Sequence, residues 1–175
     1  MTITEFAILV FKSPPIFPDP TLQTLIQKLS AWQSECSGFP LLFFTNPDDP
    51  YQVHLVTGWT SVAAHEAWIR GERNQELLRV FAPYIEMPKI RMVHLDMDFE
   101  AMPKDAGRMV VERYASTPFQ SERSDRSAWS LSGRDLAQDD GGDVFRFVGG
   151  ADQSGESEVR GGAPVERWVL GRVEP

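Results

Sequence analysis

Apolar residues in this chain follow two different periods, and the places where the period changes predict the elements of the fold. Residues 3–12 (ITEFAILVFK) and 51–59 (YQVHLVTGW) are rich in β-branched and aromatic side chains, which is typical of strands. Residues 22–36 instead repeat their large apolar side chains every three or four positions, which predicts an amphipathic helix. A second helical pattern begins after Ser61, and the glycine at position 71 predicts a break within it.

Two further strand patterns, at residues 39–45 and 89–99, complete the first half of the chain. The proline-rich segment at 13–20 (SPPIFPDP) is predicted to be a loop, because prolines fix φ and remove hydrogen-bond donors. The order is β-α-β-β-α-β over residues 1–100, which is the ferredoxin-like arrangement.

The second half, residues 101–175, has a different character. Two polar segments, 120–142 and 152–162, are predicted to be loops. Strand patterns lie around them at residues 108–115, 143–149 and 165–173.

These three strand patterns align in order with strands of the first half. Phe6 aligns with Met109, and His54 aligns with Arg146. The strand pattern that begins at Arg91 aligns with the one that begins at Arg167 (RWVLG). The alignment predicts a degenerate second repeat that kept its strands and lost its helices. The alternative is an unrelated β-rich extension.

A ferredoxin-like sheet with two apolar faces covers one face with helices and needs a partner for the other. Pairing two such sheets into a barrel supplies that partner and removes exposed edges. The predicted fold class is therefore α+β, a ferredoxin-like dimeric α+β barrel. Either the second repeat completes the barrel within one chain, as an intrachain pseudo-dimer, or a homodimer forms it.

Composition narrows the range of partners. The 175 residues carry a net charge of -8, which argues against nucleic acid or an anionic membrane surface as a partner. No apolar run is long enough to span a membrane, and the first residues lack the basic region of a signal peptide. Cys36 is the only cysteine, which excludes an internal disulfide and favours a reducing compartment. We therefore expect a cytoplasmic protein.

The run from Trp59 to Trp68, W-T-S-x-x-A-H-E-A-W, follows a strand pattern and enters a helical one. In this pattern the chain resembles the antibiotic biosynthesis monooxygenase family of dimeric α+β barrels, over about residues 3–100. The resemblance implies a pocket between helices and sheet for polyketides, quinols and similar ring systems. Members of that family include cofactor-free monooxygenases, haem-degrading enzymes and related polyketide cyclases.

The chain also departs from that family. Many quinol-oxidising members have histidine where this chain has Trp68, and haem degraders carry a ligand histidine later on the helix, where residues 73–78 (RNQELL) have none. The glycine-rich run at 141–150 lacks the lysine and the spacing of a phosphate-binding loop. We therefore expect no metal and no cofactor.

Three residues are candidates for catalysis. His94 and Asp96 share one face of a predicted strand, where a carboxylate near an imidazole favours acid–base chemistry close to neutral pH. His54 lies on another predicted strand, and we expect it to face His94 across the pocket. The alternative is that both histidines are structural and that Asp96 lies at a solvated strand end.

Aromatic and polar side chains near these strands are candidates for binding a ring-shaped substrate. They are Trp68, Trp59, Phe43, Phe81, Tyr84 and His65. The competing interpretation places the aromatic residues in the core and leaves His65 exposed.

Three functions remain open. The first is a secondary-metabolism enzyme that uses acid–base cyclisation or isomerisation of a small hydrophobic polyketide- or terpenoid-like substrate. The second is a cofactor-independent monooxygenase that oxidises an electron-rich phenol or enol with O2. The third is a non-catalytic ligand-binding or accessory protein.

Overall fold

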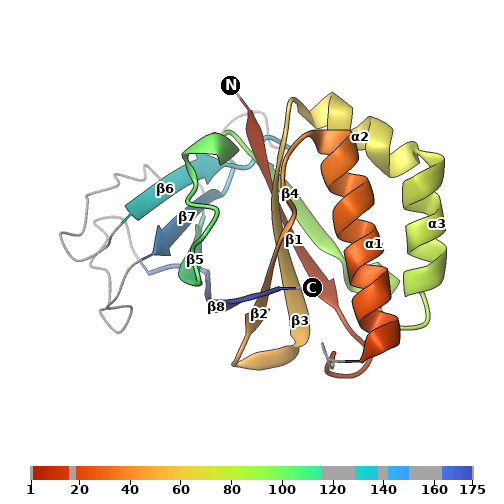
Figure 1. The fold of residues 1–175 in the computed structure, drawn as a ribbon. Helices are drawn as coiled ribbons and strands as arrows, with labels where there is room; N and C mark the ends of the chain where they lie inside the picture. Colours follow the sequence, from red (N-terminus) through yellow and green to blue (C-terminus); the bar gives the residue numbers. More distant parts are fainter. Residues whose placement is uncertain (1, 16–18, 116–128, 138–141, 150–162, 175) are drawn as a thin grey trace.

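The computed structural model describes residues 2–15, 19–115, 129–137, 142–149 and 163–174 (Figure 1). All eight strands of this part belong to one antiparallel sheet, in the order β4-β1-β3-β2-β8-β5-β7-β6. They are β1 (Ile3–Val10), β2 (Leu42–Asn46), β3 (Asp49–Trp59), β4 (Arg91–Leu95), β5 (Arg108–Tyr114), β6 (Trp129–Arg134), β7 (Val144–Gly149) and β8 (Glu166–Val173). The sheet therefore runs without interruption through both predicted halves of the chain.

The two outermost strands of the sheet meet at one end. The amide of Asp96 donates to the carbonyl of Arg134 at 3.1 Å, and the amide of Leu136 donates to the carbonyl of His94 at 2.8 Å. A bridge between Leu95 and Asp135 lies between these two hydrogen bonds. The sheet thus curls into a nearly closed barrel within one chain, which confirms the predicted ferredoxin-like α+β barrel.

The strand order contains the same pattern twice. The first half contributes β4-β1-β3-β2, and the second contributes β8-β5-β7-β6, which is the same arrangement of fourth, first, third and second strands. The predicted strand correspondences therefore hold. The residue alignment of the third strands, β3 and β7, is wrong by one position, however. His54 points into the barrel, whereas Arg146 lies between the inward-facing Phe145 and Phe147 and so points to the other face.

Strand β6 lies within the segment 120–142, which the sequence analysis assigned to a loop. That prediction is wrong for Trp129–Arg134, which pairs along its whole length with β7. The polar sequence WSLSGR lacks the β-branched residues that mark the other strands, so its pairing comes from the tertiary context.

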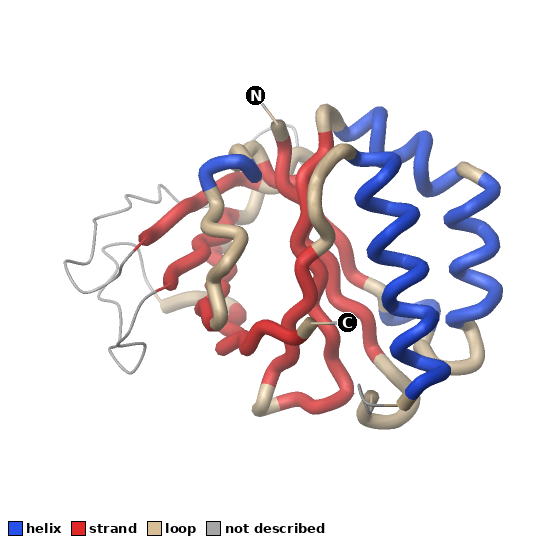
Figure 2. The backbone as a smooth tube through the Cα atoms, in the orientation of Figure 1, coloured by secondary structure: helices blue, strands red, loops and turns tan. Residues whose placement is uncertain are grey.

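The three α-helices of the described residues come from the first half and cover one face of the sheet (Figure 2). They are α1 (Pro20–Ser37), α2 (Val62–Arg70) and α3 (Glu72–Phe81), with short 3-10 turns at Met87–Lys89 and Phe99–Ala101. No helix in the described ranges has the length and apolar character needed to cross a bilayer.

The helix ends follow local chemistry. Asp19 is the N-cap of α1, because its carboxylate accepts hydrogen bonds from the backbone amides of Thr21 and Leu22. Gly38 ends α1 in the left-handed region at φ 80°, which glycine adopts without steric cost. Gly71 separates α2 from α3, so the predicted break is confirmed.

Alternation along β1 divides the buried side chains into two cores. Phe6 and Ile8 point into the barrel, where aromatic and aliphatic side chains from both halves pack. Ala7 and Leu9 point toward the helices and join a second core with α1, α2 and α3. Glu5 has the same parity as Ala7, so its carboxyl lies on the helix side.

His54 lies inside the barrel and is fully buried. Its ring stacks on Phe6 at 5.7 Å and meets the edge of Trp168 at 6.0 Å, and neither ring nitrogen has a hydrogen-bond partner among the described residues. Burial, with a smaller contribution from the charge of Arg91, lowers the pKa of His54 to about 3. The expectation that His54 faces His94 is therefore wrong, since the two side chains lie on opposite faces of the sheet.

Replacing His54 with leucine is expected to stabilise the protein by about 1–3 kcal/mol near neutral pH, because an unpaired buried polar group is removed. The gain grows as the pH falls from 6.5 toward about 3, because the unfolded chain takes up the proton there while the folded chain does not. Urea denaturation at a series of pH values measures both effects. Parallel stability curves for His54→Leu and the wild type contradict this account.

Candidate active site

A cavity of about 410 Å³ lies between the helices and the outer face of β1, β3 and β4. Its wall is mostly apolar, with Leu29, Leu55, Trp68 and Phe81 among the side chains that form it. This size and character suit a small organic ligand.

Few polar side chains reach the cavity. Glu5, Gln33, His65 and Asn74 line it, and no arginine or lysine does so among the described residues. The cavity therefore offers a carboxyl, two amides and an imidazole to a ligand, but no fixed positive charge. A neutral ligand matches this set better than an anionic one.

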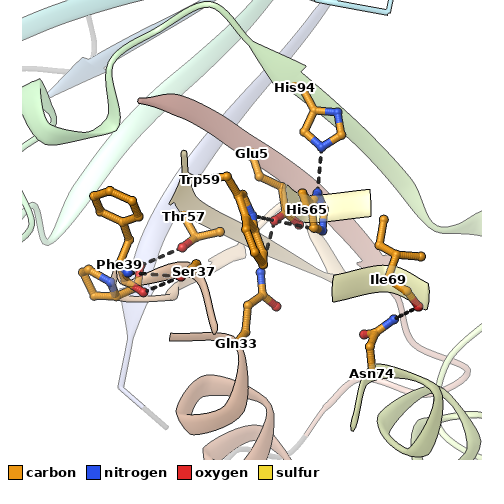
Figure 3. A network of polar contacts seen from close by, with 11 residues as sticks. Glu5, Gln33, Ser37, Phe39, Thr57, Trp59, His65, Ile69, Asn74 and His94 are labelled. Atoms are coloured by element: carbon orange, nitrogen blue, oxygen red, sulfur yellow. Dashed lines mark hydrogen bonds and ion pairs between the residues drawn. The ribbon is translucent and has the colours of Figure 1, made fainter. Parts of the chain in front are cut away.

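Glu5 is the central polar group of the cavity, and it is 4% exposed. Trp59 donates its indole N–H to Oε2 at 2.7 Å, and Gln33 donates an amide N–H to the same oxygen at 3.1 Å (Figure 3). The Nε2 of His65 lies 3.4 Å from Oε2. These contacts fix Oε2 and leave Oε1 without a hydrogen-bond partner among the described residues.

Burial raises the pKa of Glu5 to about 7, against the opposing effect of the hydrogen bonds from Trp59 and Gln33. The charged carboxylate loses its hydration in the cavity, and two donors restore only part of that stabilisation. The carboxyl therefore exchanges a proton near neutral pH. A buried carboxyl of this kind, open to an apolar cavity, has the properties of a general base or acid.

His65 and His94 continue the polar contacts from Glu5 toward the surface (Figure 3). His65 Nδ1 lies 2.7 Å from His94 Nε2, and the two rings meet edge to face at 4.9 Å. The ring of His65 also stacks on Trp59 at 4.5 Å with an interplanar angle of 20°. His65 is 3% exposed and His94 is half-buried, so the row of groups starts in the cavity and ends near solvent.

Local structure explains how these side chains meet. Glu5 on β1 is directly opposite His94 on β4, because the two strands pair antiparallel in that register. Ser61 caps α2 by accepting the amide of Ala64, which fixes the first turn of the helix and places His65 over the sheet. Trp59 ends β3 just before this turn.

The structure brings together some of the predicted site residues. Trp68, Phe81 and His65 line the cavity, and Trp59 lies behind it in contact with Glu5. Because His65 is buried, the alternative of an exposed His65 is wrong.

Other predicted residues lie apart from the cavity. Phe43 is buried in the core between helices and sheet but does not line the cavity, and Tyr84 lines a separate pocket beside Phe11. Asp96 is exposed beyond the end of β4, where its carboxylate accepts the amide of Arg134. Asp96 therefore does not pair with His94 in the way the shared parity predicted.

Sequence reasoning missed Glu5 and Gln33. Glu5 is the one charged residue within the apolar run of β1, on the parity that faces the helices. A lone acid at such a position is costly unless it is paired or functional, and this was the available signal. Gln33 gave no comparable signal, because a glutamine in a helix is ordinary.

Haem is the cofactor that the family resemblance brings into question, and the cavity residues do not fit it. Nδ1 of His65 faces His94 and Nε2 faces Glu5, so neither nitrogen points into open space as an iron ligand must. The described lining also has no cation to pair with haem carboxylates.

The chain matches no family model and no curated protein. Similar solved structures include a candidate monooxygenase from Fusobacterium nucleatum subsp. nucleatum, with a TM-score of 0.64 at 9% identity over 99% of this chain and 93% of that one. A candidate monooxygenase from Lactobacillus acidophilus NCFM gives 0.57 at 10% identity, over 98% and 93%. An anthrone oxidase-like protein gives 0.59 at 11% identity, over 99% and 92%. At these identities the similarity establishes the barrel fold alone.

Proposed function

We propose that this protein is a small-molecule enzyme that removes a proton from a neutral, largely apolar ring substrate, with Glu5 as the base. The observation that carries the proposal is the buried carboxyl of Glu5, which projects into an apolar cavity and is held through one oxygen only. The substrate class follows from the wall, which is aromatic and aliphatic and has no described cation to hold an anionic group.

The first step is transfer of a proton from an acidic C–H or O–H of the substrate to Oε1 of Glu5. The C–H or O–H bond breaks, its electron pair stays on the substrate as an enolate or phenolate, and the carboxylate becomes a carboxylic acid. Near neutral pH the pKa of Glu5, raised to about 7, leaves a large fraction of the carboxyl as the base. The side-chain amide of Asn74 lines the same cavity and donates one N–H to the carbonyl of Ile69 at 3.1 Å, which leaves its second N–H for a substrate carbonyl oxygen.

The enolate then has two fates. In the non-redox fate its carbon attacks a carbonyl of the same molecule or takes a proton at another position, and Glu5 returns the proton to the resulting alkoxide or carbon. This completes a cyclisation or an isomerisation with no net change in oxidation state. It requires only the groups that line the cavity.

The second fate is oxygenation, and the names of the similar structures favour it. The enolate of an anthrone reduces O2 and combines with it to a hydroperoxide, which loses water to leave a carbonyl. The overall change is anthrone plus O2 to anthraquinone plus water, so O2 is the oxidant and no metal or flavin enters the balance. Two neighbours named as candidate monooxygenases and one named anthrone oxidase-like support this candidate.

Anthrone is a suitable probe, because it is neutral, has three fused rings and carries an acidic methylene. In deuterated buffer without oxygen, the wild type is expected to accelerate exchange of the methylene hydrogens well above the buffer rate, as measured by mass spectrometry. Admitting O2 then separates the two fates, since quinone formation with matching O2 uptake indicates oxygenation. Binding of anthrone without any accelerated exchange contradicts the proposal and favours a non-catalytic carrier.

A further inference from the structure

Three proton-carrying groups lie in one row from the cavity to the outside of the barrel. They are the carboxyl of Glu5, the imidazole of His65 and the imidazole of His94, with separations of 3.4 Å and 2.7 Å between neighbouring atoms. The second distance is a short hydrogen bond, and the first becomes one with a small rotation of the carboxyl. All three side chains lie on the helix side of the sheet (Figure 3).

The outer end of the row is open to water. His94 is half-buried, and its Nδ1 has no hydrogen-bond partner among the described residues. Burial lowers the pKa of His94, while the charges of Asp135 and Glu66 act in the opposite direction. Glu66 on α2 and Asp135 beyond β6 are the acidic groups near this ring, and both favour a proton there.

The inner end of the row is closed. Glu5 is surrounded by Trp59, Gln33 and His65, and a ligand in the cavity covers its remaining oxygen. A proton taken from the substrate therefore has no direct contact with water while the cavity is filled. Both proposed fates return a proton to the product, so a separate path is needed only for Glu5 to exchange its proton with water and to become a base again when it has been protonated from solvent.

We infer that His65 and His94 carry protons between Glu5 and solvent. This inference takes Glu5 as the base, and so rests on the proposed function. The carboxyl first rotates by half a turn, which exchanges its two oxygens and brings the proton taken up on Oε1 beside His65. The carboxyl then gives this proton to His65 Nε2, His65 gives the proton on Nδ1 to His94 Nε2, and His94 releases the proton on Nδ1 to water. One proton leaves, each nitrogen–hydrogen bond broken is matched by one formed, and Glu5 ends as a carboxylate.

The transfers occur together, without a lasting charge on His65. Burial and the neighbouring His94 lower the pKa of His65 to about 3, so a free imidazolium there is disfavoured. Each imidazole has two nitrogens that exchange donor and acceptor roles, which permits the concerted transfer. The row resets when the carboxyl and the rings turn their hydrogens back.

The test is made with the cavity filled by anthracene, a neutral hydrocarbon of three fused rings with no acidic hydrogen, so that water cannot reach Glu5 from the cavity side. A rapid pH jump across the pKa of Glu5, followed by time-resolved infrared absorption, reports the loss of the carboxylic acid carbonyl band. The Glu5→Gln variant identifies the band by removing it. The measurement is made on the wild type, on His94→Gln, whose amide still reaches His65 but cannot pass a proton on, and on His94→Ala, which leaves space for added imidazole.

We expect deprotonation of Glu5 to slow by at least about 10-fold in both His94 variants. Added imidazole restores the rate in His94→Ala and has no effect in His94→Gln. A merely structural role for His94 predicts instead that the glutamine variant keeps the wild-type rate. Rates within about two-fold of the wild type in His94→Gln overturn the inference, as does the absence of any titrating Glu5 band.

Failure of this inference is distinguishable from failure of the proposed function. A wild type that shows the His94-dependent pH-jump kinetics but does not exchange anthrone contradicts the proposed function alone. A wild type that exchanges anthrone through Glu5, with pH-jump kinetics independent of His94, contradicts the proton path alone.

Discussion

Replacing Glu5 with glutamine is expected to lower anthrone hydrogen exchange by at least about 100-fold, because the amide cannot accept the substrate proton. The amide is nearly isosteric with the carboxyl, and its oxygen still accepts hydrogen bonds from Trp59 and Gln33. The measurement is the oxygen-free exchange assay with the wild type beside it. Glu35→Gln is the matched control, since Glu35 is an exposed glutamate on α1 paired with Arg73.

The same substitution is expected to change stability in a way that depends on pH. The pKa of Glu5 is about 7 in the folded chain, whereas its ordinary value of 4.5 applies in the unfolded chain. Between these two pH values the folded state therefore holds a proton that the unfolded state has lost. The wild type therefore loses stability as the pH rises from 4.5 to 7, by roughly 3 kcal/mol from this one group. Glu5→Gln lacks this loss, and denaturant unfolding at several pH values should reveal it.

Two results would count against this assignment of Glu5. Exchange that stays within a few-fold of the wild type in Glu5→Gln shows that another group removes the proton. A pH dependence of stability that is the same in both proteins shows that Glu5 ionises normally in the folded chain. In either case the cavity would lose its candidate base.

Replacing Phe147 with alanine is expected to lower the free energy of unfolding by about 3–5 kcal/mol. Phe147 lies on β7 in the second half, is fully buried, and packs edge to face on Phe6 of β1 at 5.6 Å. Because the barrel interior is one core shared by both halves, the helices of the first half should unfold in the same transition. Far-ultraviolet circular dichroism during denaturation reports the loss of helix and therefore follows this coupling.

The control is Tyr51→Ala, which removes an aromatic side chain that is 44% exposed and is expected to change stability by about 0.5 kcal/mol or less. A helix signal that persists after the second half has unfolded would mean that residues 1–100 fold as an independent unit. That outcome would support the predicted division at residue 100 and contradict a single cooperative core.

Hydrophobic patterning was sufficient to predict much of the fold. The helix break at Gly71 and the twice-used strand order follow from local chemistry and from the need to cover both faces of a sheet. Strand β6 escaped prediction because its partner strand, and not its own propensity, holds it in place.

The candidate site was less accessible to sequence reasoning. Parity along a strand places side chains on a face, but it does not say which face of one strand meets which face of another. His54 and His94 were therefore assigned to one cavity although β1 lies between their strands and they point to opposite sides. The pair that does form, His65 with His94, joins helix α2 to strand β4, and no local pattern encodes that contact.

The helices of the described chain lie over the strands of one half only, and this asymmetry frees the sequence from a symmetry constraint. In a barrel made of two identical chains, every substitution appears twice, so a residue that improves one face is imposed on the other. Here Glu5 on β1 and Glu112 on β5 occupy different surroundings, one beside Trp59 and the other beside Tyr114 and Arg146. A substitution in one half therefore leaves the other half unchanged. The second half can serve to complete the barrel core while the first half keeps the residues of the candidate active site.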